Sequence, residues 1–391
     1  MKTFLPRWFS VPCCVSTNEL PERQSPGIEK LENRIAPAGV LAVASAGNHG
    51  DVKLFHDTNN DGIPDAFPYA ELFGGSRAVA VGHFTSTTNL QVAVANDTGP
   101  ALVKIYQLDA NDVPTGVVES FTPFKNNRGV FLSRYHSAGA TFDSLIVSED
   151  RGAKPLVEVY NDGSTLNGAV ANDGLLGDSN IDSFLAFKST FAGGVRIGAG
   201  RNLTAGAVSD FLALAPGPGA PPLSLVVRDT NGDLMLSDNL GTADSVLAFA
   251  KTFRAGVFVT VGDVGSPSAN AELIFSQGAG GTGMVSIFSD TNNNGKFSDE
   301  PGPASSFQAY GPGYHGAVRV AAARLSPAAV NLQGELIVAP GGISKLPALV
   351  LKAANNGEIM QIGAATSVVP FFPFGPDNIT VQNVAYGGNG S

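Results

Sequence analysis

The sequence predicts an all-β fold, a six-bladed β-propeller built from four-stranded antiparallel blades. Three observations lead to this prediction. Glycine and proline are abundant, with 47 Gly and 25 Pro in 391 residues, and charged residues make up only 15%, which is typical of short strands joined by turns. Three kinds of strand-like phrase recur in the same order six times along the chain. The strand that the first repeat lacks occurs at the end of the chain.

The first phrase joins an aromatic-rich strand, through a glycine turn, to a strand of alternating apolar residues. Clear copies occupy residues 184–198, 246–262 and 307–320, and weaker copies occupy residues 72–81, 121–132 and 371–381. Gly129, Gly194, Gly256 and Gly316 stand at equivalent places and are separated by 65, 62 and 60 residues. Four short strands with their loops need about this length.

The second and third phrases are also strands. The second is apolar and ends in a Gly-rich turn, at residues 41–47, 92–99, 145–152, 211–217, 273–278 and 336–341. The third alternates apolar and polar residues, at residues 52–55, 103–106, 157–160, 225–227, 285–288 and 349–351. Such alternation between Gly or Pro turns indicates β-strands. Because a single blade with two apolar faces cannot be stable alone, neighbouring blades must cover it, which favours a closed ring.

The chain order predicts how the ring closes. The first repeat begins at Gly39 with its second strand, and residues 378–385 form a surplus strand at the other end. We expect this strand to complete the first blade, so that residues 39–391 form one domain. A solenoid would need capping repeats at both ends. The six copies of each phrase predict six blades, and a seven-bladed ring is the alternative that the sequence leaves open.

Residues 1–38 differ from the rest and are interpreted as a leader or disordered export segment. Lys2 and Arg7 precede a short apolar stretch, residues 8–15, which Pro12 interrupts. A secretory signal, a disordered tail and a lipid anchor on Cys14 are the three alternatives. Cys13 and Cys14 are the only cysteines, so we expect neither disulfides nor cysteine metal sites in the folded body.

Charge and hydropathy restrict the partners. The net charge is -10 and no Lys/Arg cluster occurs, which argues against nucleic acid because phosphate binding requires a basic face. No stretch approaches the 18 apolar residues of a transmembrane span. We therefore expect a monomeric protein that is secreted or displayed on the cell surface.

Three acidic turns that follow third strands are candidate metal sites. In the first turn, oxygen ligands stand at positions 1, 3, 5 and 9, Gly62 permits the turn and the Ile63 carbonyl can contribute. The candidate ligands are Asp57, Asn59, Asp61, Ile63 and Asp65; Asp290, Asn292, Asn294 and Ser298; and Asp229, Asn231 and Asp233. Hard oxygen ligands at this spacing suit Ca²⁺. The alternative is that Asp, Asn and Gly only form hairpin turns.

The repeat resembles the FG-GAP or VCBS-like propellers related to the integrin α head, in particular their planctomycete versions. The matching segments are Gly256–Asp263, Gly194–Gly200 and the turns Gly217–Gly219 and Gly278–Gly280. Residues 30–38 resemble a leader motif of planctomycete surface and exported proteins. The resemblance implies calcium loops after the Gly-Asp pair, but this chain has Asp263-Val-Gly-Ser-Pro-Ser there, without the expected ligands.

These features predict a non-catalytic binding or adhesion module of the cell surface, stabilised by Ca²⁺, with a protein or glycan ligand that the sequence does not identify. One alternative is a hydrolase or lyase that uses the central channel. His83 and His136 support it, because they end equivalent strands and would lie near one face of the ring. The other alternative is a purely structural envelope protein.

Overall fold

The computed structural model describes most of the chain after residue 38. The described ranges are 39–45, 51–72, 76–96, 101–125, 128–169, 171–200, 209–265, 271–325, 334–342, 344–353, 366–373 and 381–387. The chain divides into two units, Met1–Ala36 and Pro37–Ser391, and only the second is described below. The predicted leader, residues 1–38, lies outside the described residues.

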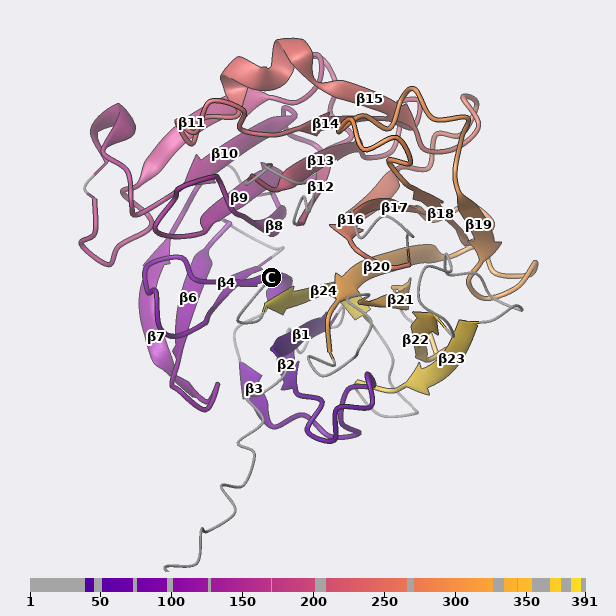
Figure 1. Cartoon of the computed structure of the whole chain (residues 1–391), viewed down its shortest axis with the longest axis horizontal. Coiled ribbons are helices and arrows are strands. Elements are labelled where there is room, and N and C mark those ends of the chain that lie inside the picture. The colour runs from indigo at the N-terminus through magenta and orange to yellow at the C-terminus, as the bar shows by residue number, and fades with distance from the viewer. Residues whose placement is uncertain are drawn as a thin grey trace, which may run out of the picture. The chain divides into compact units, whose positions relative to one another are not determined.

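The second unit is an all-β propeller of six four-stranded antiparallel blades, as predicted, and the blades follow one another around a common axis (Figure 1). The inner strands are β4 (Ser76–Gly82), β8 (Val130–Tyr135), β12 (Val195–Gly200), β16 (Val257–Gly262), β20 (Ala317–Ala323) and β24 (Val381–Gly387). The second strands are β1 (Val40–Ser45), β5 (Gln91–Asn96), β9 (Ser144–Glu149), β13 (Phe211–Pro216), β17 (Glu272–Gln277) and β21 (Glu335–Gly341).

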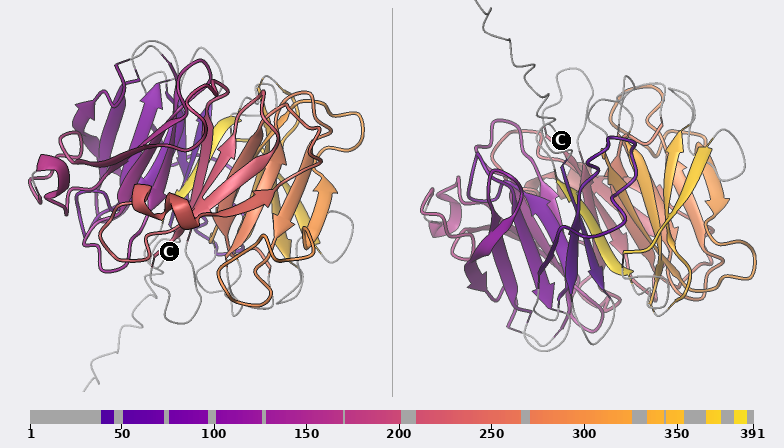
Figure 2. Two further views of the ribbon diagram at one scale, coloured as in Figure 1. Left: turned by 90° about the horizontal axis from the view of Figure 1, so that it is seen from above. Right: turned by 90° about the horizontal axis from the view of Figure 1, so that it is seen from below.

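The third and outer strands complete each blade. The third strands are β2 (Val52–Phe55), β6 (Val103–Leu108), β10 (Leu156–Tyr160), β14 (Leu223–Val227), β18 (Met284–Phe288) and β22 (Ala348–Ala353). The outer strands are β3 (Ala70–Leu72), β7 (Pro114–Phe121), β11 (Asn180–Leu185), β15 (Asp244–Leu247), β19 (Ser305–Gln308) and β23 (Thr366–Phe371). Blades are numbered from 1, which contains β24 and β1–β3, to 6, which contains β20–β23. In the side views the strands of each blade run between the two ends of the ring (Figure 2).

The last strand closes the ring, as the chain order predicted. β24 pairs antiparallel with β1, with Leu41 opposite Tyr386 and Ala42 opposite Ala385. A single parallel contact between Gly341 and Val381 then links blade 6 to blade 1. The predicted start of this strand, residues 378–380, lies outside the described residues.

Six apolar clusters of described residues form the core, one between each pair of adjacent blades. Alternate residues of a strand belong to different clusters. On β1, Leu41 and Val43 pack against blade 6, whereas Val40, Ala42 and Ala44 pack against blade 2. Each blade therefore buries both faces, which explains why the second strands are buried along almost their whole length.

The aromatic phrases do not coincide with the outer strands. The prediction placed strands at residues 184–187 and 246–249, but β11 ends at Leu185 and β15 at Leu247. The later aromatic residues lie in the turn after the strand, where Phe187 packs on Phe191 and Phe249 on Phe253, with ring centroids 5.6 Å apart in both pairs. The first aromatic residue of a phrase, such as Phe184 or Phe307, thus lies on the outer strand, and the later rings fill the turn that follows.

Close approach of the inner strands restricts side-chain size. A Cβ at Gly198 would lie 2.4 Å from the Val259 carbonyl oxygen, and one at Gly262 would lie 2.2 Å from the Ala322 Cβ. Small polar side chains fit and bridge adjacent blades, since Ser133 Oγ accepts from the Ala199 N–H (3.1 Å). At these positions the inner strands need small residues, because the strands lie too close together near the axis for larger side chains.

Carboxylates on outer strands hold the next blade at three of the interfaces. Asp182 Oδ2 accepts the N–H groups of Leu236 and Ser237, each at 2.8 Å. Glu119 accepts those of Leu176 and Gly177 at 2.6 and 2.7 Å, and Asp244 accepts those of Phe297 and Ser298 at 2.6 and 3.0 Å. In each case the first amide belongs to a buried apolar residue, Leu236, Leu176 or Phe297, that inserts into the interface core. We call these contacts the carboxylate clamps.

Helical structure in the described residues consists of two 3-10 segments, Leu166–Gly168 and Ser237–Thr242. Neither has the length or the apolar character that crossing a bilayer requires.

Replacing Asp182 by Ala is expected to lower the free energy of unfolding by about 1–3 kcal/mol, because two buried amides lose their acceptor. Asp182→Asn keeps one acceptor oxygen, so it should lower the free energy of unfolding by clearly less than Asp182→Ala. The measurement is urea unfolding followed by circular dichroism. Asp178→Ala, an exposed aspartate close by in the chain, is the control and should change stability by less than about 0.5 kcal/mol. Equal loss in the control would contradict the clamp.

Candidate functional site

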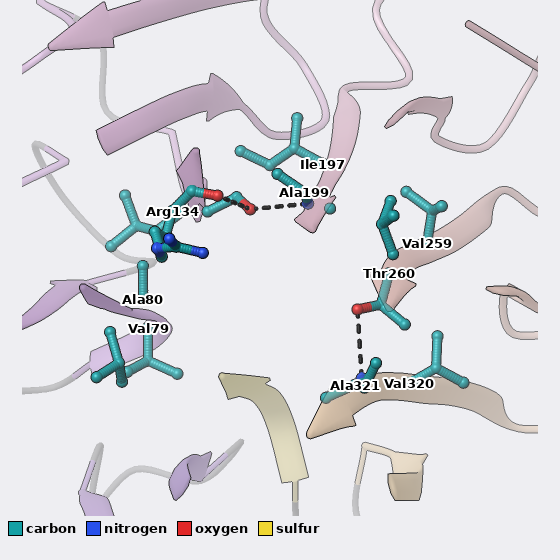
Figure 3. A pocket seen from close by; sticks show the side chains of 15 residues that line it. Val79, Ala80, Arg134, Ile197, Ala199, Val259, Thr260, Val320 and Ala321 are labelled. Atoms are coloured by element: carbon teal, nitrogen blue, oxygen red, sulfur yellow. Dashed lines mark hydrogen bonds between the residues drawn. The ribbon is translucent and has the colours of Figure 1, made fainter. Parts of the chain in front are cut away.

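A cavity of about 100 Å³ lies on the propeller axis (Figure 3). It is lined by consecutive residues of five inner strands: Val79–Val81, Leu132–Arg134, Ile197–Ala199, Val259–Val261 and Val320–Ala322. The place that Arg134 takes on β8 is taken by Val81, Ala199, Val261 and Ala322 on the other four strands. Arg134 is therefore the one charged side chain among these fifteen, and its guanidinium points toward the axis (Figure 3).

Two buried carboxylates bind Arg134. Its Nε lies 2.9 Å from Asp143 Oδ2, and Nη1 lies 3.5 Å from Asp210 Oδ2. Burial acts to raise the pKa of Asp143, but the His136 ring and the Arg134 guanidinium hold that pKa well below its usual range. Burial raises the pKa of Asp210 despite the nearby Arg134 charge. Asp143 is therefore the permanently ionised partner of the arginine.

Both aspartates also join blades. Asp143 Oδ2 accepts the His83 N–H (2.8 Å), and Asp210 Oδ2 accepts the His136 N–H (2.9 Å). The backbone bonds are reciprocal, since the Asp143 N–H donates to the His83 carbonyl and the Asp210 N–H to the His136 carbonyl, both at 2.8 Å. The inner strands of blades 2 and 3 therefore end in identical, rigidly held positions, and both predicted histidines occupy them.

His136 has a carboxylate partner that sequence reasoning missed. Its Nδ1 lies 3.1 Å from Asp143 Oδ1, and its side chain is 35% exposed. The His83 Nδ1 instead lies 3.1 Å from the Ser86 carbonyl oxygen. Asp143 follows His136 by seven residues, and the hairpin of β8 and β9 brings the two together. The sequence contains one signal for this contact. An aspartate directly precedes the second strand in two successive repeats, as Asp143 and as Asp210.

We call the end of the ring where the inner strands finish the exit face, and the opposite end the entry face. Arg134 lines the cavity at its exit end, and Asp143, Asp210 and His136 lie in contact with it or with one another; we call these four residues the exit mouth. The His136 imidazole is held by the buried Asp143 carboxylate, and it lies beside the Arg134 guanidinium, which contacts both Asp143 and Asp210. Such a group can bind polar ligands or move a proton at the free imidazole nitrogen. Most of the fifteen lining residues are aliphatic by type, but the surface that faces the cavity is mainly polar, and none of the lining residues is an acid or a histidine.

The acidic turns lie on the same exit face, because each follows a third strand. In the first turn Asp57 Oδ1 accepts the Asp61 N–H (3.1 Å), and Asp57 Oδ2 accepts the Gly62 N–H (2.6 Å). Asn59 Oδ1 accepts the Asp61 N–H and Asp61 Oδ1 accepts the Ile63 N–H, at 3.1 and 2.8 Å. Asp65 accepts from Thr58. The predicted ligands are thus also the hydrogen-bond acceptors that shape the turn.

The second turn repeats this pattern. Asp290 accepts the amides of Asn294 and Gly295, and the side chain of Asn294 accepts the Lys296 N–H. Ser298, predicted as a ligand at its end, has its backbone N–H held by the Asp244 clamp. The third turn is related, since Asp229 accepts from Asn231, Gly232 and Leu234 and the Asn231 side chain donates to Asp233.

The turns do not present an assembled cluster of strong ligands. Within the described ranges, no three side chains of His, Cys, Asp or Glu gather in a way that could hold a metal ion. The donor set nevertheless fits Ca²⁺, because a carboxylate oxygen that accepts one amide retains a second lone pair. Burial raises the pKa of Asp57, and the charges of Asp61 and Asp65 raise it further. A divalent cation would offset this repulsion, so Asp57, Asn59, Asp61, Asp65 and the Ile63 carbonyl are the residues that would hold it.

Millimolar CaCl₂ is expected to raise the melting temperature of the protein relative to EDTA, because a ligand of the folded state stabilises it by roughly 1.4 kcal/mol at ten times its Kd. Asp61→Asn should reduce the shift by removing one charge from the first turn. Asn294→Asp, at the equivalent position of the second turn, should increase it. Differential scanning calorimetry with MgCl₂ as the control measures both. A melting temperature that is the same in CaCl₂ and EDTA would refute calcium binding.

The first acidic turn also packs against blade 6. Lys352 Nζ donates to the Asp61 carbonyl, and a Cβ at Gly62 would lie 2.5 Å from Glu335 Oε1. Gly62 has φ +75°, so both its backbone and its surroundings favour glycine. Burial raises the pKa of Glu335 to about 7, against the opposing charge of Lys352. Glu335 therefore titrates near neutral pH at the contact between blades 6 and 1.

The raised pKa of Glu335 has a defined effect on stability. The pKa of Glu335 is about 7 in the folded state, above its ordinary value of 4.5, so the folded state binds this proton more tightly. The free energy of unfolding therefore falls as the pH rises from about 4.5 to 7. Glu335→Gln lacks this decrease, so its stability relative to wild type should rise by up to about 3 kcal/mol over that interval. Urea unfolding at pH 4.5, 5.5, 6.5 and 7.5 measures the difference. A difference that does not change with pH would contradict the assignment.

The other histidines do not contribute to the exit mouth. His56 stacks on Tyr69 with ring centroids 3.9 Å apart, and its Nε2 lies 3.5 Å from Asp112. His315 Nδ1 lies 2.9 Å from the Gly281 carbonyl oxygen. His49 lies outside the described residues.

Comparison with known proteins supports the fold alone. No protein-family model matches the chain, and no curated protein matches it either. One similar solved structure is the crystal structure of a candidate 6-phosphogluconolactonase from Bacteroides fragilis. It is 11% identical with a TM-score of 0.52, and the match covers 91% of this chain and 99% of that one.

Proposed function

We propose that this protein is a non-catalytic binding module whose ligand contacts the exit face. The observation that carries the proposal is the exit mouth itself. Arg134, Asp143 and Asp210 hold one another rigidly, and they present the His136 imidazole, 35% exposed, at the end of the axial cavity. Pre-ordered polar groups lose little entropy on binding, so a rigid mouth favours recognition.

The placement of charge favours binding over catalysis. The low pKa of Asp143 removes it as a proton donor near neutral pH, and its oxygens are occupied by Arg134, His136 and the His83 amide. The cavity behind the mouth is small, and its lining residues include no acid and no histidine that could act on a substrate. Function on a repeated scaffold of this kind resides in side chains and loops at its ends.

The wider proposal places the protein on the cell surface or among secreted proteins, with a glycan or protein as its ligand and Ca²⁺ as a stabilising ion. Its support is the acidic composition and the acidic turns on the exit face. The strand Gly256–Asp263 and the recurring Gly turns support the related proposal that the blades are FG-GAP-like repeats.

A second candidate function is a hydrolase or lyase that acts at the exit mouth. The observation that favours it is the His136–Asp143 contact of 3.1 Å, because a buried carboxylate can orient an imidazole for proton transfer. The likeness to a candidate lactonase is compatible with this function but shows the fold only.

The proposal is tested with the double variant His83→Ala/His136→Ala. The tagged protein is applied to a glycan array and used in pull-downs from cell-envelope extracts, with Ca²⁺ and with EDTA. Loss of polar contacts at both strand ends should weaken binding at least tenfold, since two lost hydrogen bonds cost about 2 kcal/mol or more. Lys188→Ala/Lys251→Ala, with both lysines exposed on the entry face, is the control and should bind like wild type.

The outcomes separate the candidates. Equal loss in the entry-face control would exclude the exit mouth as the binding site, and no partner under any condition would contradict the binding function. If the wild type instead converts a lactone or glycan and His136→Ala abolishes turnover, the enzyme is the correct assignment.

A further inference from the structure

Basic residues gather at the entry face of this acidic protein. Arg196 and Arg319 lie near Asp150 there, Arg151 follows Asp150 in the chain, and Arg128 lies beside Gly152. A Cβ at Gly194 would lie within 3.0 Å of Arg196 Nη1 and 2.6 Å of the Arg151 backbone nitrogen, and a Cβ at Gly152 would lie 2.9 Å from Arg128 Cζ. With a net charge of -10 for the whole chain, such a local excess of positive charge needs an explanation.

Two of these arginines belong to a layer across the axis. The layer consists of the residues that directly precede the cavity-lining triplets on four consecutive inner strands, and these are Phe131, Arg196, Phe258 and Arg319. Their strand partners are also equivalent, namely Ser148, Ala215, Ser276 and Ala339. Each of the four residues lies one position closer to the entry face than the lining triplet of its strand, so the four side chains lie next to the entry end of the axial cavity.

Aromatic rings and guanidinium groups alternate in this layer. Arg196 Cζ lies 4.3 Å from the Phe131 centroid and 5.1 Å from the Phe258 centroid. Arg319 Cζ lies 3.6 Å from the Phe258 centroid. An aromatic ring stacks on the flat face of a guanidinium through a cation–π interaction, and the N–H groups at the edge of the guanidinium can still donate hydrogen bonds. The stack thus fixes both arginines without using all of their donors.

Two positive charges lie close together among the described residues of this layer. Arg196 Nη1 donates to Asp150 Oδ1 at 2.8 Å, but its Nε, although buried, has no hydrogen-bond partner. Burial and then the Arg196 charge lower the pKa of Arg319 to about 9. The Arg151 charge acts in the same direction on Arg196. The two guanidinium groups repel each other, and a bound anion would offset the cost of keeping their charges close together.

We propose that Arg196 and Arg319 bind a small oxyanion at the entry end of the axial cavity. The chemical group is a phosphate, sulfate or carboxylate, whose oxygens match the planar N–H fork of arginine. Phe131 and Phe258 hold the guanidinium planes and exclude water from their faces. This site lies at the opposite end of the cavity from the exit mouth and does not depend on the proposed function.

Isothermal titration calorimetry of the full chain tests the site. Sodium phosphate, sulfate and acetate are titrated separately at pH 7.5, with NaCl keeping the ionic strength constant. We expect saturable binding of one anion per chain. Tighter binding of phosphate and sulfate than of acetate identifies a tetrahedral dianion as the ligand, and the reverse order identifies a carboxylate.

Variants locate the binding. Arg319→Gln and Arg196→Gln should each weaken binding at least tenfold, and Arg319→Lys, which keeps the charge but loses the fork, should weaken it less. Arg254→Gln, an exposed arginine on the entry face, is the control and should bind like wild type. Circular dichroism checks folding. If Arg196→Gln does not fold, the half-buried Arg319 carries the test.

Two results would overturn the proposal. One is the lack of saturable heat for all three anions in the wild type, which would leave the layer as a structural floor of the cavity. The other is binding by Arg319→Gln within twofold of wild type, which would place the anion elsewhere.

Discussion

The pairing of β24 with β1 is the contact on which the rest of this fold depends. Every blade has two apolar faces and needs a neighbour on each side, so an open row of blades would leave two faces in water. Residues 40–45 and 381–387 are separated by most of the chain, yet together they complete blade 1. Once that blade exists, blades 6 and 2 both have a partner, and the six interface clusters form a closed series. Because the closing contact is so remote in sequence, its loop-closure entropy must be offset by burial at all the interfaces together.

Closure also determines where chemistry is found. Inner strands that meet at an axis bring equivalent positions from successive blades together. A single residue that differs from its equivalents in the other repeats therefore changes the chemistry of the channel at that level. Arg134 replaces an aliphatic residue at one such level, and the arginine and phenylalanine layer lies at another. The two ends of the cavity consequently differ in character. The exit mouth combines one arginine with two aspartates and a histidine, whereas the described residues of the entry end include Arg196 and Arg319 near Asp150.

Much of the fold was accessible from sequence because it is repeated. Period-2 alternation and regular Gly turns predicted the inner, second and third strands, and the surplus strand predicted closure. The outer strands were displaced, since Phe187 and Phe249 pack in the turns after β11 and β15. The site was less accessible for a physical reason. The partners of His136 and Arg134 come from another strand or another blade, and no local spacing predicts a contact such as that between Arg134 and Asp210. The acidic turns were recognised, but their role in holding blades together, through Asp244 for example, depends on residues more than 50 positions away.

The crowding of the inner strands has a consequence for how such a protein can diversify. At Gly198 and Gly262 even one added methyl group would collide with the adjacent strand, so the bore of the channel is set by backbone geometry. Substitutions that alter recognition must therefore accumulate at the two rims, where a side chain can grow into open space. The inner strands near the axis would then tolerate little change, whereas the loops at the two ends of the ring could change independently. The two ends of one molecule could therefore acquire unrelated ligands.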